Sequence, residues 1–282
     1  SKRRAMPLVC DARVGLAELA AALEGWRAPP PWTADAKAQR TAWIETAARY
    51  TAASNVERPS DAQVIGAVQR ALGRDIAILC AAGGLPGELH KLWQAAAPGT
   101  YHLEYGFSCM GYEIAGGIGL KLADPTREVV VMVGDGSYMM ANSELATSVM
   151  LGTKLIVVLL DNRGFGCINR LQHTTGGERF NNLYEFNTRQ ERQPEIDFAA
   201  HARALGAEAR KASSLAELEE ALAAARKSDR TTVIVIDTDP MASTGAGGHW
   251  WDVAVSEVSQ RPEVVEARRA YEAALAGQRA GD

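Results

Sequence analysis

The sequence predicts an α/β fold, a parallel sheet with helices on both faces, and two patterns support this prediction. Short apolar runs rich in β-branched residues occur at 76–80, 128–133, 155–160 and 231–237. Because these runs show no alternation, they are typical of strands buried on both faces. Helical stretches lie between them, most clearly at 143–151 and at 214–226, where Ser214 and Glu217 have capping-box spacing. Strand alternating with helix favours a parallel sheet.

The segment before the first predicted strand is expected to be mostly helical, with one linker. Residues 14–24 have helical spacing, and the three consecutive prolines within 25–32 are expected to prevent any helix there. A polar, alanine-rich helix is predicted over 34–52. The run Pro-Ser-Asp at 59–61 has the residue types that begin helices, so another helix is expected to start here.

The stretch 128–166 is predicted to form one β-α-β unit. Its first strand ends directly before a Gly-Asp-Gly turn at 134–136. Ser143 is expected to cap the helix between the strands, and Gly152 is expected to end it. The second strand is expected to end at Leu160.

Polar residues with metal-binding chemistry follow both strands of this unit. Asp135 and Asn162 project from the carboxyl edge of the predicted sheet, which is where ligands bind in open α/β folds. Gly134 and Gly136 allow backbone N–H groups to approach a phosphate, which an isolated aspartate would repel. A magnesium ion bridging the Asp135 carboxylate to a diphosphate removes this conflict, with the Asn162 amide oxygen and the Gly164 carbonyl as further ligands.

Two other interpretations of this loop compete with a magnesium site. A Gly-Asp-Gly sequence alone is more often a simple glycine turn. A dinucleotide-binding fold would explain Gly134, Gly136 and an acidic Asp161 at the end of the next strand, but Met139 stands where the third glycine belongs. A Walker-type loop is excluded because its motif does not occur in the sequence.

The composition is that of an ordinary globular protein with a sizeable core. The chain has 282 residues, of which 47% are hydrophobic and 23% charged. Its 30 basic and 34 acidic residues give a net charge of -4 and are scattered along the chain. We therefore do not expect nucleic acid as a partner.

Cysteine usage and hydropathy indicate a soluble, cytoplasmic protein with no membrane partner. The cysteines show no spacing typical of a zinc site or a disulfide framework. They are Cys10, Cys80, Cys109 and Cys167. The basic residues at 1–4 are not followed by a signal-type apolar stretch, because Asp11 and Arg13 interrupt it. The longest apolar runs are far shorter than the ~20 residues of a membrane span.

The Gly-Asp-Gly turn at 134–136, followed by an asparagine at the end of the next strand, resembles the signature of thiamine diphosphate enzymes. The family members in question are of the pyruvate decarboxylase and acetohydroxyacid synthase type, and the resemblance covers roughly residues 55–240. It implies that Asp135, Asn162 and the carbonyl of Gly164 bind Mg²⁺, and that the cofactor is thiamine diphosphate.

The resemblance also implies which residues contact this cofactor. A bulky apolar residue upstream of the signature aspartate supports the bent cofactor, and here it is Met110, for which a core methionine is the alternative interpretation. The carbonyl of Ser108 is implied to accept a hydrogen bond from the cofactor's amino group. The full implied set is Gly84, Leu85, Ser108, Met110, Gly134, Gly136, Ser137 and Phe165.

Three longer strings narrow the resemblance. The segments 104–113, 161–172 and 250–259 are similar to the family's hydrolases that open a cyclic 1,2-dione during myo-inositol breakdown. The implied substrate is a small cyclic diketone, which water opens between its two carbonyls to give 5-deoxy-glucuronate. Two alternatives stay open: an enzyme acting on a 2-oxo acid, as acetohydroxyacid synthase and 2-oxo acid decarboxylases do, and a non-catalytic cofactor-binding subunit.

Family members hold the cofactor between two domains, and the second domain brings a glutamate to the pyrimidine ring. This sequence resembles only the diphosphate-binding domain, at 55–240. We therefore expect 1–54 to be the end of a middle domain plus a linker, and 241–282 to be a closing segment with a helix. The chain is expected to be inactive without the amino-terminal portion of the same enzyme, and family analogy implies a homodimer or homotetramer.

The sequence assigns no catalytic residue on this chain, although His249 is a candidate. It follows the glycine-rich stretch 245–248, which suits a segment that closes over a site, but such segments also carry bystander residues. The other histidines have no titratable partner at a useful spacing and are expected to be structural. They are His90, His102, His173 and His201.

Overall fold

The computed structural model describes residues 6–187, 195–247 and 253–278. The chain divides into two units, and each is considered by itself. The larger unit, Thr46–Gly248, contains the sheet, and the smaller unit consists of Ser1–Glu45 and His249–Asp282.

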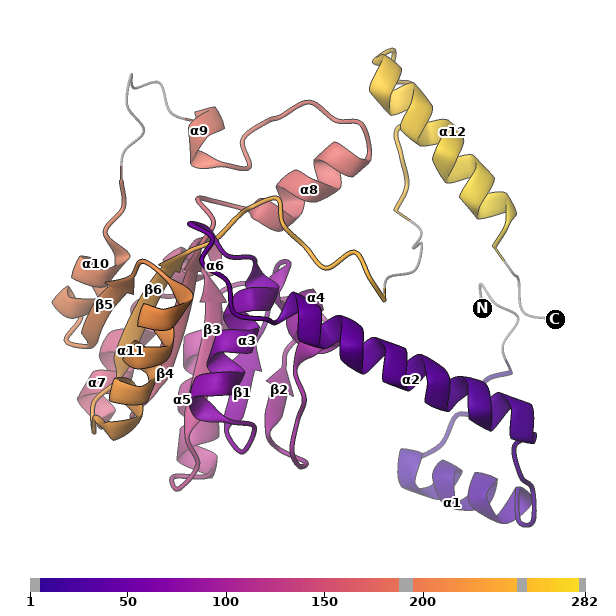
Figure 1. The fold of residues 1–282 in the computed structure, drawn as a ribbon, viewed down its shortest axis with the longest axis horizontal. Helices are drawn as coiled ribbons and strands as arrows, with labels where there is room; N and C mark the ends of the chain where they lie inside the picture. The colour runs from indigo at the N-terminus through magenta and orange to yellow at the C-terminus, as the bar shows by residue number, and fades with distance from the viewer. Residues whose placement is uncertain (1–5, 188–194, 248–252, 279–282) are drawn as a thin grey trace. The chain divides into compact units, whose positions relative to one another are not determined.

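A six-stranded parallel sheet forms the centre of the larger unit, which confirms the predicted fold class (Figure 1). The strand order is β2-β1-β3-β4-β6-β5. The bounds are β1 (Ala77–Cys80), β2 (Tyr101–Leu103), β3 (Val129–Gly134), β4 (Ile156–Asp161), β5 (Glu208–Ala212) and β6 (Thr232–Asp237). The four apolar runs are confirmed as β1, β3, β4 and β6, whereas the sequence analysis did not predict the edge strands β2 and β5.

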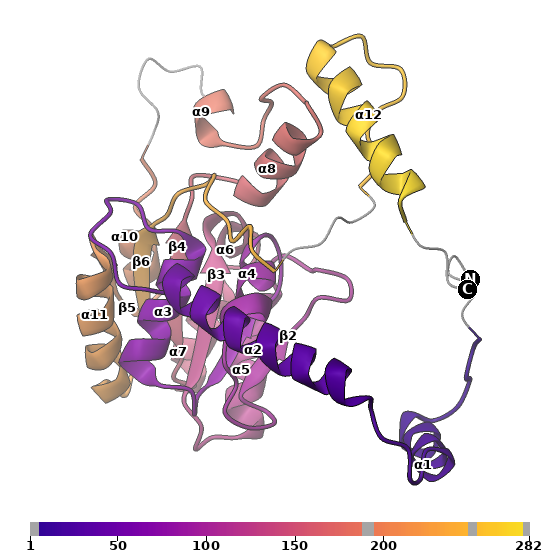
Figure 2. The ribbon, with the colours of Figure 1, turned by 45° about the vertical axis from the view of Figure 1, so that its right-hand side comes forward.

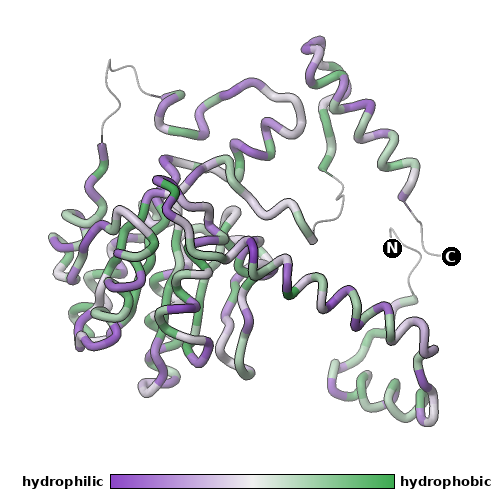
Figure 3. Tube along the Cα trace, viewed as in Figure 1, coloured by the Kyte–Doolittle hydropathy of each residue, from purple (hydrophilic) through white to green (hydrophobic). Residues whose placement is uncertain are grey.

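Helices cover both faces of this sheet. The helices of the larger unit, including the end of α2, are α2 (Pro30–Tyr50), α3 (Asp61–Leu72), α4 (Leu85–Leu92), α5 (Tyr112–Ala123), α6 (Asp135–Met140), α7 (Glu144–Leu151), α8 (Gly166–Thr174), α9 (Tyr184–Asn187), α10 (Phe198–Ala204) and α11 (Leu215–Lys227). One core joins alternate strand residues to side chains of α5, α6, α7 and α10, while α3, α4 and α11 pack on the other face. Figure 3 shows the strands as the most hydrophobic part of this unit.

Several helix boundaries follow the predicted chemistry. The Ser60 hydroxyl accepts a hydrogen bond from the Gln63 N–H, and the Gln63 side chain accepts one from the Ser60 N–H, so a capping box begins α3. Ser214 caps α11 by accepting from the Glu217 N–H. The Glu217 carboxylate, however, accepts from Ser213 and not from Ser214.

Three local predictions are wrong. Ser143 makes no side-chain cap, because its backbone is already helical, although Gly152 does end α7 in the left-handed conformation. The prolines within 25–32 do not prevent a helix: α2 begins at Pro30, where a proline needs no N–H partner. The residues 134–136 do not form an isolated turn, since Asp135 is the first residue of α6.

The amino edge of the sheet is closed by satisfied polar groups. The buried Ser148 hydroxyl donates to the Thr153 carbonyl and bonds to the Thr231 hydroxyl, both at 2.6 Å. Lys154 forms an ion pair with Glu128 at 3.0 Å. At the exposed Asp124, hydrogen bonds from Thr126 and Arg127 hold the pKa of the carboxyl below its usual value.

The smaller unit contains α1 (Ala12–Ala22), most of α2 and α12 (Pro262–Ala276). Asp11 caps α1 by accepting from two backbone N–H groups. In α12, Arg268 pairs with Glu272 one turn later at 2.8 Å. Within the part of the chain that the structure describes, no helix has the length and apolar character to cross a membrane.

Candidate functional site

The carboxyl ends of β1, β3 and β4 lie at one edge of the sheet, with α6, α8 and α9 beyond it (Figures 1 and 2). The register pairs Gly134 with Leu160. Asp135 is therefore level with Asp161, and Asn162 lies one residue further along. The two polar residues that the sequence analysis selected are thus brought to neighbouring positions.

Asp135 is a buried carboxylate that has no hydrogen-bond or ion-pair partner among the described residues. It is 0% exposed, and neither carboxylate oxygen meets hydrogen-bond geometry with a described protein group. Burial, together with the nearby Asp161 carboxylate, raises its pKa to about 7, against smaller lowering effects of the Gly136 and Gly164 N–H groups and of Tyr184. A buried carboxylate without a partner costs several kcal/mol, so the fold retains an unfavourable group here.

Asn162 and Gly164 present two neutral oxygens beside this carboxylate. The Asn162 amide oxygen is buried and also lacks a hydrogen-bond partner. Gly164 has a φ of 141°, and a side chain there would approach the Asn182 carbonyl to 2.4 Å. The loop is fixed by the Phe165 N–H, which donates to the Asn182 carbonyl at 2.7 Å, so only glycine fits this tightly held backbone.

These oxygens fit a small, hard divalent cation. They comprise one carboxylate, one amide and one backbone carbonyl, and magnesium usually takes one or two carboxylates and keeps water or phosphate in its other positions. No group of three or more His, Cys, Asp or Glu suited to a metal occurs within 6–187, 195–247 and 253–278. The donor set therefore favours a magnesium-type ion over zinc.

The predicted diphosphate loop lies in contact with the loop after β4. A Cβ atom at Gly136 would lie 2.7 Å from the Phe165 ring and 3.6 Å from the Gly164 carbonyl oxygen. Gly134 precedes the first residue of α6, and nothing lies within 4 Å of a Cβ placed there. A side chain at position 136 would therefore clash with the Phe165 ring, whereas position 134 has room for one.

The loop that carries Ser108 and Met110 is tied to the same place. Ser108 has a φ of 53° and is exposed, and Met110 is half-buried. The next residue, Gly111, donates its N–H to the Ser137 hydroxyl at 2.8 Å. The Ser137 hydroxyl is thus engaged within the protein, and it links the loop of Met110 to α6.

Gly84 and Leu85 begin α4 after β1. A Cβ at Gly84 would lie 2.3 Å from the Arg170 guanidinium, which donates to the Pro240 carbonyl at 2.6 Å. The Leu85 side chain is buried, so this residue can offer only its backbone to a ligand. Gly84 is the member of this pair that lies beside α8.

Two residues at the edge were not predicted. Glu113 accepts hydrogen bonds from Ser137 and Gly111. Tyr184, in α9, faces Asp135, whose charge adds to burial in raising the tyrosine pKa. Glu113 lies in the segment 104–113, whose similarity to the family's hydrolases gives this residue no role. Nothing in the sequence around Tyr184 indicates that it lies near Asp135.

Three histidines of the larger unit contact tyrosine hydroxyls within the fold. His201 bonds to the Tyr138 hydroxyl at 2.9 Å, and His102 bonds to the Tyr112 hydroxyl at 2.8 Å. His90 lies 3.5 Å from the Tyr101 hydroxyl. The candidate His249 lies outside the described residues.

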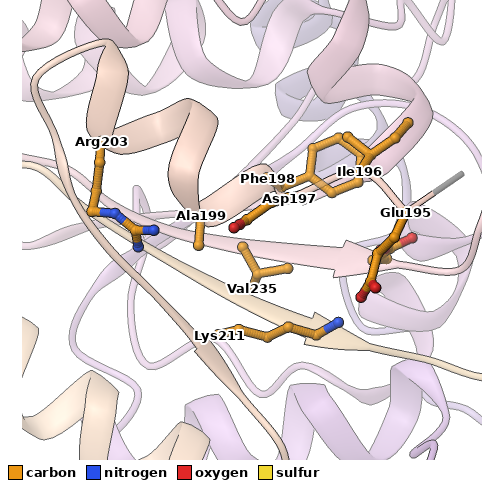
Figure 4. Close-up of a pocket in the computed structure, with 9 residues that line it drawn as sticks. Glu195, Ile196, Asp197, Phe198, Ala199, Arg203, Lys211 and Val235 are labelled. Atoms are coloured by element: carbon orange, nitrogen blue, oxygen red, sulfur yellow. The ribbon is translucent and has the colours of Figure 1, made fainter.

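A separate cavity of about 420 Å³ opens beside β4, β5 and β6 (Figure 4). Its charged lining residues are Asp161, Glu195, Asp197, Arg203 and Lys211. Lys211 is paired with Asp237 at 2.9 Å, and Arg203 donates to the Ala209 carbonyl. Of the lining residues, Asp161 is the one that borders the Asp135 site, and no residue predicted from the sequence to bind metal or cofactor lines this cavity.

Comparison with known proteins shows which family the chain resembles. Residues 81–236 match the family described as "Thiamine pyrophosphate enzyme, C-terminal TPP binding domain". The chain is 46% identical over 206 residues to the 3D-(3,5/4)-trihydroxycyclohexane-1,2-dione hydrolase of Halalkalibacterium halodurans, covering 73% of this chain and 32% of the relative. It is 43% identical over 224 residues to the hydrolase of the same name from Bacillus subtilis, covering 79% and 34%.

Solved structures show the same fold at lower identity. Benzoylformate decarboxylase from Polynucleobacter necessarius gives a TM-score of 0.55 at 21% identity, covering 63% of this chain and 32% of that one. The thiamine diphosphate-dependent 4-hydroxybenzoylformate decarboxylase of Rhodococcus jostii RHA1 gives 0.58 at 22% identity, covering 67% and 34%. The chain spans about a third of the length of the curated relatives it matches. It belongs to the thiamine pyrophosphate enzyme family, whose C-terminal TPP-binding domain it contains.

Proposed function

We propose that the carboxyl edge binds Mg²⁺ and thiamine diphosphate, the same compound as thiamine pyrophosphate. The observation that supports this most strongly is Asp135, a buried carboxylate with two unpartnered oxygens beside the unpartnered amide oxygen of Asn162. A divalent cation would balance the charge of the carboxylate and would be bound by the oxygens of both side chains. Asp135, Asn162 and the Gly164 carbonyl are the proposed ligands.

The protein's other residues bind and orient the cofactor in this proposal. The backbone of Gly84, Leu85, Gly134 and Gly136 faces the diphosphate, with Ser137 and Phe165 beside it. Met110 supports the rings, and the Ser108 carbonyl holds the amino group. When bound, thiamine diphosphate supplies the carbon nucleophile, while the protein supplies position and exclusion of side reactions.

The proposed reaction is hydrolytic opening of 3D-(3,5/4)-trihydroxycyclohexane-1,2-dione to 5-deoxy-glucuronate in myo-inositol catabolism. One water is consumed and the bond between the two carbonyl carbons breaks. One of these carbons takes the oxygen of water and becomes a carboxylate, and the other takes a hydrogen and becomes an aldehyde. The names of the relatives at 43–46% identity support this substrate over a 2-oxo acid.

We further propose that turnover needs the amino-terminal portion of the same enzyme. The described residues contain one sheet, and the relatives are about three times as long as the matched part. In the proposed enzyme the acid–base group for the pyrimidine ring lies in that other portion.

The test combines binding with turnover. Calorimetry should show that the chain binds thiamine diphosphate only with Mg²⁺ present. Adding the amino-terminal portion as a separate polypeptide should then give ring opening of the dione but no turnover of pyruvate. Preference for a nicotinamide or flavin cofactor would contradict the cofactor assignment. Pyruvate turnover without dione turnover would contradict the substrate, and full activity of the 282-residue chain alone would contradict the need for a second portion.

A further inference from the structure

Glu113 forms a closed set of hydrogen bonds at the carboxyl edge. It lies in the first turn of α5 and is 1% exposed. Its carboxylate accepts from the Ser137 hydroxyl at 2.7 and 2.8 Å and from the Gly111 N–H at 3.1 Å. Gly111 also donates to the Ser137 hydroxyl at 2.8 Å, so the three groups contact one another.

These contacts join segments that meet only in the folded chain. Gly111 directly follows Met110, and Ser137 directly follows Gly136. The N–H of Ala82, in the segment after β1, lies near the same carboxylate and lowers its pKa against the larger effect of burial. Glu113 therefore lies where three loops that carry proposed cofactor contacts come together.

The packing of α5 does not require a carboxylate at this position. The other buried residues of the helix are Ile114, Gly117 and Ile118, which pack against the sheet as apolar groups. A buried carboxylate costs free energy unless its oxygens are hydrogen-bonded, and here Ser137 and Gly111 meet that need. These hydrogen bonds fix the distance between the loop that contains Gly111 and the loop that contains Ser137. Apolar packing, which is not directional, would fix this distance less precisely.

We propose that Glu113 is a positioning residue, which fixes the loop that supports the cofactor's rings relative to the loop that holds its diphosphate. This proposal rests on the proposed function. A ligand that bridges both loops gains from their fixed separation because less ordering is needed on binding. A ligand that reaches only the diphosphate loop does not.

Two probes separate these cases: thiamine diphosphate, which spans both loops, and inorganic diphosphate, which occupies one. With Mg²⁺ in excess, Glu113→Ala should weaken thiamine diphosphate binding by at least about tenfold and inorganic diphosphate binding by less than about threefold. Glu113→Gln should restore most of the loss, because its amide can accept from Gly111 and donate to the Ser137 oxygen.

A stability control and a second variant complete the design. Ser148→Ala removes a buried hydrogen-bonded hydroxyl at the opposite edge, and it should lower stability while leaving the affinities for both probes unchanged. If Glu113→Ala does not fold, Ser137→Ala removes both hydrogen bonds from this hydroxyl while keeping the volume of Glu113. Like Glu113→Ala, the Ser137→Ala variant should lose more affinity for thiamine diphosphate than for inorganic diphosphate.

The measurement is titration calorimetry on the 282-residue chain. Selective loss of thiamine diphosphate in Glu113→Ala, with recovery in Glu113→Gln, is the expected result. Equal weakening of both probes, or no weakening of either, would overturn the positioning role. If the unmodified chain bound neither probe, the proposed function would instead be overturned. In that case the Asp135→Ala variant and the unmodified chain would give the same absence of binding.

Discussion

The amino and carboxyl edges of the sheet, where the strands begin and end, differ in whether their buried polar groups have hydrogen-bond partners. At the amino edge, Ser148 and Thr231 satisfy each other and Lys154 is paired with Glu128. At the carboxyl edge, Asp135 and Asn162 keep acceptor oxygens without a partner. Packing along β4 is equally tight at both ends, since every residue of this strand is at most 5% exposed. The proposed function explains this difference, because the oxygens without a partner are those proposed to bind the cation.

The acidic groups show the same contrast. Burial raises the pKa of Asp61 to about 6 and that of Asp135 to about 7, and it also raises the pKa of Glu113. At the amino edge the pKa of Asp124 is lowered by its hydrogen bonds. Burial thus disfavours negative charge at Asp61, Asp135 and Glu113, whereas hydrogen bonds favour it at Asp124.

The largest expected effect is that of Asp135→Ala. The change removes the one carboxylate of the proposed magnesium shell, so Mg²⁺-dependent thiamine diphosphate binding should fall at least about hundredfold, or ~2.8 kcal/mol. Stability of the ligand-free chain should not fall, because an uncompensated buried carboxylate is removed. Calorimetry and urea unfolding measure the two quantities, and undiminished affinity would remove this residue from the site.

The next effect is a pH dependence at Asp61. Its folded-state pKa of about 6 exceeds the ordinary 3.8, so its contribution to stability is complete below pH 3.8 and is lost as pH rises through 6. Asp61→Asn should therefore gain stability relative to the unmodified chain by on the order of 2 kcal/mol between pH 4 and 7.5.

Asp124→Asn is the matched control for this pH dependence. The pKa of Asp124 is lowered, so its contribution is present above its ordinary pKa and is lost as pH falls. Its effect should have the opposite sign and be small, since the residue is exposed. Urea unfolding across the pH range measures both variants, and slopes of the same sign would contradict the contrast between the edges.

A smaller effect is expected for Ser148→Ala at the amino edge. The variant removes the hydrogen bonds that Ser148 makes to the Thr153 carbonyl and to the Thr231 hydroxyl, while the bond from the Thr231 hydroxyl to the Thr153 carbonyl remains. The loss of two buried hydrogen bonds should lower the free energy of unfolding by about 1.5 kcal/mol. Thiamine diphosphate affinity should stay within about twofold of the unmodified value. Weakened binding at unchanged stability would show that the edges are not independent.

The smallest effect is expected for Asn162→Ala. A neutral ligand is lost while the carboxylate remains, so Mg²⁺-dependent binding should weaken about fivefold, or ~1 kcal/mol. Titrating Mg²⁺ at fixed cofactor concentration measures this change. A loss as large as that of Asp135→Ala would mean that the amide has a role beyond donating one oxygen.

The proximity of Asp135 and Asn162, the proposed metal ligands, could be predicted from the sequence because β3 and β4 are long, apolar and buried. Once their ends are located, parallel pairing brings Asp135 and Asn162 to one edge. β5 has the sequence EARKA with a mostly exposed pattern, and β2 has only three residues. Such edge strands have no clear hydropathy signal, because they are only partly buried. They are strands because each pairs with one neighbouring strand.

The contacts that cross between loops could not be predicted. Glu113 is a polar residue in a short string, and only its approach to Ser137 makes it a buried hydrogen-bond acceptor. The cap at Ser143 failed because the backbone there is helical, a conformation that residue type alone does not reveal. The start of α2 at Pro30 shows that prolines interrupt a helix but also suit its first turn.

The position of β6 has a consequence during synthesis. It is the last strand in the chain, yet it lies between β4 and β5. A nascent chain that has left the ribosome only as far as Gly164 already contains all three proposed oxygen donors. The outer edge of β4 then remains unpaired until about 70 more residues have been translated, because β6 supplies its partner. During that interval an apolar strand edge is open to other nascent chains, so slow translation through this stretch favours aggregation before the sheet can close.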